Sequence, residues 1–147
     1  MELELQDVGL RLLAAAGVGG AIGINRDVED KPIGMRTLGL VALSAAIVSV
    51  ASIQVPGMAE HPDALSRVVQ GILQGVMAGI GFIGAGVILR DREAGTVRGL
   101  TTAATVWVSA ALGIACGLGA WGVVAIGTTI ALLLLVLVKA FEHLFKR

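Results

Sequence analysis

A stripe of hydroxyl-bearing side chains with an arginine at its start is the first feature of this sequence that could support chemistry. The stripe consists of Arg98, Thr102, Thr105 and Ser109, which follow helical spacing, with Thr101 beside it. In an apolar helix, such hydroxyls bond to neighbouring helices or to their own backbone, or they line a polar cavity. Gln70 and Gln74 lie one helical turn apart and could face the same space. The sequence leaves both interpretations open.

Two charged clusters outside the apolar segments are further candidates. The segment from Asn25 to Lys31 mixes charges of both signs, which is typical of surface ion pairing; alternatively, Arg26 or Arg36 closes one face of the protein or contacts a partner. The second cluster consists of Glu60, His61 and Asp63. Hard divalent cations such as magnesium prefer oxygen ligands, so this cluster is a weak candidate metal site, the alternative being a solvated loop.

The sequence offers little else for catalysis or cofactor binding. GIGFIG, from Gly79 to Gly84, matches the dinucleotide-binding pattern GxGxxG, but it lies inside an apolar run with no strand before it. We therefore predict glycine-mediated packing there and no cofactor. Cys116, the single cysteine, is expected to be a small buried residue. No nucleophile–base pair is recognisable, which argues against an enzyme.

The composition indicates a membrane protein. Of 147 residues, 56% are hydrophobic and only 15% are charged, with a mean hydropathy of +0.88. Soluble domains carry about 25% charged residues, so this chain has too little polar surface for water. The formal net charge of zero argues against nucleic-acid binding, which requires a basic excess.

Five apolar segments, each near the roughly 20 residues that span a bilayer, predict an all-α, polytopic bundle of five transmembrane helices. The expected spans are 8–24, 37–55, 68–89, 99–117 and 121–138, within a single domain covering 1–147. A turn near Leu118–Ala120 would make the last two an antiparallel hairpin. Their fusion into one long helix is the main alternative.

The third span is unusually rich in glycine. It contains Gly71, Gly75, Gly79, Gly81, Gly84 and Gly86. The first three recur every four residues and form a flat strip that another helix can approach closely. This pattern predicts that the third helix lies at the packed centre of the bundle.

The charges in the connections predict the orientation. Nine of the eleven basic residues fall in the first and third connections and the C-terminal tail. By the positive-inside rule, the N-terminus is outside and the C-terminus cytoplasmic, which requires an odd number of spans. The acidic N-terminus predicts no cleaved signal peptide. Arg11, near the end of the first span, is expected to reach the lipid headgroups.

Two long motifs resemble the MgtC/SapB family of bacterial inner-membrane proteins. They are GIGFIGAGVIL, from Gly79 to Leu89, and GLTTAATVW, from Gly99 to Trp107. Arg26 and the segment GMRT, from Gly34 to Thr37, resemble a third family motif. The first connection departs from the family pattern, because Asn25 and Asp27 stand where relatives usually have glutamates. Better-known members carry a C-terminal cytoplasmic domain, whose functions we do not expect here.

The resemblance implies a role in magnesium homeostasis or adaptation to low magnesium. It favours a non-enzymatic regulator that acts through membrane partners, such as an ion-transport ATPase or ATP synthase. The alternative is a small oligomeric transporter or channel for magnesium or another small solute, lined by the third and fourth helices. Both hypotheses place the protein in the bilayer of the bacterial inner membrane, and the second in particular would need a homo-oligomer.

Overall fold

The computed structural model describes residues 3–28, 31, 33–55, 60–90 and 99–145, and these residues form five helices with no strand. The helices are α1 (Leu5–Asp27), α2 (Met35–Ile53), α3 (Pro62–Arg90), α4 (Leu100–Gly117) and α5 (Trp121–Phe145). The first four are long and apolar enough to cross a membrane, and α5 has a shorter described apolar stretch, Trp121–Leu137. The all-α bundle of five helices predicted from the sequence is confirmed.

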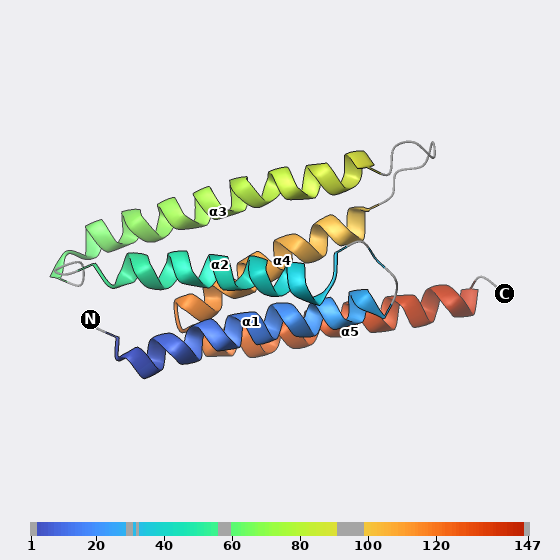
Figure 1. The fold of residues 1–147 in the computed structure, drawn as a ribbon, viewed down its shortest axis with the longest axis horizontal. Coiled ribbons are helices and arrows are strands. Elements are labelled where there is room, and N and C mark those ends of the chain that lie inside the picture. Colours follow the sequence, from blue (N-terminus) through green and yellow to red (C-terminus); the bar gives the residue numbers. More distant parts are fainter. Residues whose placement is uncertain (1–2, 29–30, 32, 56–59, 91–98, 146–147) are drawn as a thin grey trace.

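The core of the bundle is α4, which contacts each of the other four helices. Figure 1 shows α4 crossing the middle of the molecule beside α2, with α3 along one edge and α1 and α5 along the other. In the apolar stretches, 61% of the α4 residues are buried, compared with 33% in α2 and 11% in α3. Ile22 from α1, Leu38 from α2 and Val106 from α4 are fully buried together.

Glycines on α1 and α4 allow the backbones of α1, α2 and α4 to approach closely. A Cβ atom on Gly113 of α4 would lie 2.8 Å from Ala42 Cα of α2, and one on Gly117 would lie 2.6 Å from Ser49 Cβ. A Cβ on Gly19 of α1 would lie 2.8 Å from Ala42 Cβ. Any side chain at these positions would separate the helices, which is how small residues act in membrane bundles.

The expectation that α3 is the packed centre is wrong for the single chain. Its inner face does contact the core through Val76, Met77, Ile80 and Val87. However, added Cβ atoms would meet nothing within 4 Å at five of its six glycines: Gly71, Gly75, Gly79, Gly81 and Gly86. Gly84 alone of the six faces a neighbour, and its Cβ would lie 3.5 Å from Ala103 Cβ. Packing of the five open glycines against another chain stays a prediction.

The helix ends follow local sequence rules. Helix α3 begins six residues before the predicted span, because Pro62 suits a first helical position and Asp63 is favourable in a first turn. Between α4 and α5, Gly119 has a φ of 75°. The Ala120 N–H donates to Ala115 O (2.9 Å) and the Gly119 N–H to Cys116 O (3.0 Å), which is a Schellman helix end. The predicted hairpin is confirmed, and one long helix is excluded.

Candidate functional site

A buried arginine joins the end of α1 to the start of α4. Arg26 has only 2% of its surface exposed, and its guanidinium donates a hydrogen bond to Thr102 Oγ1, which is also buried. Burial of a guanidinium costs free energy unless it is hydrogen-bonded, so this contact constrains both helices. Arg26, which the sequence placed in a cluster of surface charges, is therefore an interior residue.

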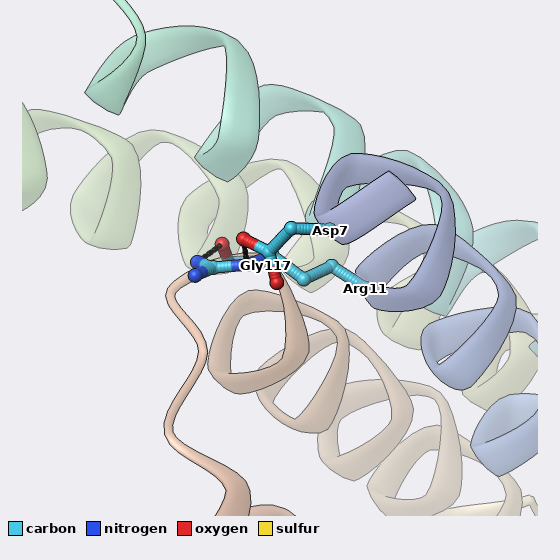
Figure 2. Close-up of polar contacts among 3 residues, drawn as sticks. All are labelled: Asp7, Arg11 and Gly117. Carbon is cyan, nitrogen blue, oxygen red and sulfur yellow. Dashed lines mark hydrogen bonds and ion pairs between the residues drawn. The ribbon is translucent and has the colours of Figure 1, made fainter. Parts of the chain in front are cut away.

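A second arginine joins the opposite ends of the same two helices (Figure 2). The Arg11 Nε–H donates to Asp7 Oδ2 (2.9 Å), and an Nη1–H donates to Gly117 O (2.9 Å), the last residue of α4. The carbonyls at a helix C-terminus lack intrahelical donors and attract cations. The side chain of Arg11 is 11% exposed, and its reach to the lipid headgroups stays a prediction. It ends against α4 because that helix end offers an unpaired carbonyl oxygen.

Together, the two arginines set the register of α1 against α4. Arg11 and Arg26 are fifteen residues apart, and so are their partners Thr102 and Gly117. The pairs run in opposite directions, as expected for antiparallel helices, and Figure 1 shows that arrangement. Both helices have the same rise per residue, so satisfying one pair brings the other into place.

The predicted hydroxyl stripe lies inside the bundle. Thr102, Thr105 and Ser109, which we call the inner polar row, are 4%, 5% and 0% exposed. Thr105 Oγ1 donates to Thr102 O (2.7 Å), its own helix backbone. Ser109 Oγ is buried and has no hydrogen-bond partner among the described residues. Two of the three hydroxyls therefore make the hydrogen bonds that the first interpretation predicts, Thr102 to Arg26 of α1 and Thr105 to its own helix backbone, and a polar cavity beside Ser109 stays a prediction.

Asp27 organises the connection between α1 and α2. Its carboxylate accepts a hydrogen bond from the Met35 N–H (2.9 Å), the first residue of α2. The first N–H groups of a helix lack intrahelical acceptors, and a carboxylate there is stabilising. A side chain on Gly34 would collide with this carboxylate, so the glycine in the predicted GMRT motif leaves room for the contact.

The outward face of α3 carries the remaining polar groups of the predicted site. Gln70 and Gln74 are exposed there, and they do not share a space with the buried inner polar row. The residues at every fourth position, which we call the α3 outer row, are also exposed: Asp63, Arg67, Gly71, Gly75 and Gly79.

The other predicted residues lie apart from these contacts. Arg36 and Thr101 are exposed, and Arg98 lies outside the described residues. Glu60, His61 and Asp63 are exposed at the start of α3, and no group of three or more His, Cys, Asp or Glu in the described ranges is arranged to hold a metal ion. Cys116 is fully buried.

Sequence reasoning missed the arginine contacts and the close-packing glycines. Nothing in the residue types distinguishes Gly113 from Gly75. The spacing of fifteen between Arg11 and Arg26 was a usable signal, because the same interval separates the polar start and the glycine end of α4.

Four long apolar helices, a fifth apolar helix and a closed interior together define a multi-pass, all-α membrane protein. The model of the MgtC family matches residues 12–144. This chain therefore belongs to the MgtC family.

Named relatives agree with this assignment. Protein SrpB of Synechococcus elongatus is 46% identical over 87% of this chain and 72% of its own length. Protein MgtC of Salmonella typhimurium is 46% identical over 75% of this chain, and Protein SapB of Bacillus subtilis is 37% identical over 77%. The matches cover only 43% and 48% of the MgtC and SapB chains. None of these names is that of an enzyme, and no solved structure matches this chain.

Proposed function

We propose that this protein is a non-enzymatic regulator in the bacterial inner membrane that acts in adaptation to low magnesium through contacts with other membrane proteins. The observation that carries the proposal is the burial of the inner polar row. Thr102, Thr105 and Ser109, the hydroxyls best placed to line a path, are buried inside the single chain, and Thr102 is bonded to Arg26 of α1. A single bundle of this kind can present surfaces to partners within the bilayer. The magnesium role and the class of partner, an ion-transport ATPase or ATP synthase, come from the family resemblance.

Ion flux distinguishes regulation from transport. The purified protein in proteoliposomes, with an entrapped magnesium-sensitive dye, is expected to give no more uptake than empty liposomes. Pull-down of the tagged full chain from membranes of cells grown in low magnesium is expected to recover a membrane ATPase. Robust uptake by the purified protein alone would overturn the regulator proposal.

A transporter or channel is the second candidate, and the outward position of Gln70 and Gln74 favours it. These amides could line a path only between copies of the chain, because they face away from the bundle. In that case Gln74→Leu would reduce magnesium uptake, whereas Thr105→Val, which changes a buried hydroxyl bonded to its own backbone, would not.

The orientation is also part of the proposal. The last turns of α1, α3 and α5 and the first turns of α2 and α4 lie at one end of the bundle (Figure 1). The positive-inside rule assigns that end to the cytoplasm. A C-terminal green fluorescent protein fusion is expected to fluoresce, and a C-terminal alkaline phosphatase fusion to be inactive. The reverse pair of results would place the C-terminus outside.

A further inference from the structure

The outward face of α3 is poorly suited to lipid. Gly71, Gly75 and Gly79 are exposed there, and a Cβ added to any of them would meet no neighbour among the described residues within 4 Å. Gln70 and Gln74 expose amides beside them, and hydrocarbon offers such groups no hydrogen bonds. Only 11% of the apolar stretch of α3 is buried, less than in α1, α2 or α4. This face therefore needs a protein surface over it.

We propose that the occupant of this face is the same face of a second copy, packed across a two-fold axis perpendicular to the membrane. Copies inserted with one orientation bring their α3 helices together in parallel. The α3 outer row, with a small residue at three successive fourth positions, is the ridge along which two such helices approach most closely. This inference does not depend on the proposed function, because a regulator or a transporter could use the same dimer.

The charges of the outer row balance each other at the start of α3 and can be shared with a second copy. Asp63 and Arg67 are both exposed and lie one turn apart at the same end of α3. No ion pair joins them within the described chain, although one-turn spacing would allow it. In a parallel pair, Asp63 and Arg67 of each copy lie level with the same residues of the other, and each carboxylate then has an arginine one turn along on its own helix and a second one on the other copy.

The side-chain amides of the outward face can also pair between two copies of the chain. A glutamine side chain both donates and accepts hydrogen bonds, so Gln74 can pair with its own copy across a two-fold axis. An interface of this symmetry brings the same patch of each subunit together, and it requires such self-matching groups. The face therefore supplies both charge and hydrogen-bond partners for itself.

Cysteine cross-linking in native membranes tests the interface. Oxidation of the full-length Gly75→Cys variant with copper phenanthroline is expected to give a disulfide-linked dimer. The control is Gly17→Cys, because Gly17 is likewise an exposed glycine without a neighbour within 4 Å, but on α1. The wild-type chain, whose Cys116 is buried, controls for the native thiol. Equal cross-linking of both variants, none at Gly75, or a cross-link from Gly75 to a different protein would overturn the proposal.

A charge-swap experiment tests the proposal even if a glycine variant fails to insert. Asp63→Arg and Arg67→Asp each place two like charges on one helix, so homodimers of either variant are repelled while the mixed pair is attracted. Two differently tagged variants are expected to co-purify about tenfold better with each other than either does with its own copy. Absence of this preference would overturn a parallel two-fold arrangement.

Discussion

Helices α3 and α4 are both rich in small residues, yet they occupy opposite environments. Gly113 and Gly117 of α4 lie so close to α2 that no side chain would fit, whereas a Cβ added to Gly71, Gly75 or Gly79 of α3 would meet no other described residue within 4 Å. The difference lies in what faces each helix, because α4 has four helical neighbours and α3 lies at the edge. A glycine every fourth residue marks a surface made for close approach, and it does not say whether the approaching helix belongs to the same chain.

The largest difference in stability is expected when a bulky residue replaces a glycine of α4 and, separately, a glycine of the α3 outer row. Gly113→Leu should destabilise the bundle by roughly 3 kcal/mol, because its side chain would push α2 away from α4. Gly75→Leu should leave the stability of the monomer almost unchanged. Unfolding of each purified variant by SDS titration measures both effects. Equal destabilisation would mean that α3 is packed as tightly as α4.

A smaller effect is expected at the buried end of the α1–α4 pair. The hydrogen bond from Arg26 to Thr102 involves a charged donor in a buried place, and such bonds contribute about 1.5–3 kcal/mol. A double-mutant cycle with Arg26→Ala and Thr102→Ala should give a coupling energy in that range. Arg26→Ala with Thr101→Ala, at an exposed neighbour, is the control and should show no coupling.

The contacts of Arg11, at the other end of the α1–α4 pair, should contribute less to the stability of the protein, since Asp7 is partly exposed. Arg11→Met removes the bond to Gly117 O and should cost about 1 kcal/mol. Asp7→Asn removes only the charge of a one-turn pair and should cost about 0.5 kcal/mol or less. The SDS midpoints of the two variants test this order. A larger loss for Asp7→Asn would show that the ion pair, and not the helix-end contact, holds Arg11.

The smallest effect is expected on the inner face of α3. A Cβ at Gly84 would meet Ala103 at ordinary contact distance, so Gly84→Ala should be neutral or stabilise by up to about 1 kcal/mol through helix propensity. Gly79→Ala should match it in monomer stability. Destabilisation by Gly84→Ala alone would indicate that α3 packs on α4 more closely than the side-chain distances suggest.

The sequence was sufficient to predict the number and positions of the helices, because hydropathy and turn residues act locally. The Leu118–Ala120 turn is an example, since Gly119 adopts the left-handed conformation that ends α4. The neighbours of each helix could not be predicted in this way. Gly113 and Gly75 have the same type and similar apolar surroundings, and only the three-dimensional arrangement separates them.

Only part of the candidate site was predicted, because the spacing of residues along a helix is a local property and the neighbours of that helix are not. Helical spacing correctly grouped Thr102, Thr105 and Ser109 on one face, but spacing alone does not reveal whether a face meets water or another helix. Arg26 was recognised as special through its motif and not through its burial. The contact of Arg11 with α4 was missed because its acceptor, a carbonyl oxygen at residue 117, is a backbone atom that no residue type reveals.

The paired arginines of α1 also limit how the protein can move. Fifteen residues of helix span about 22 Å, so Arg11 and Arg26 fix α4 at two points far apart along its length. A slide of α1 along α4 by one turn would break both contacts at once, and a tilt would stretch at least one. A conformational change that keeps both contacts would therefore move α1 and α4 together and displace another helix instead. Helices α3 and α5 are the two candidates, because each buries few of its described residues: Ile80 and Gly84 in α3, and Val124 in α5.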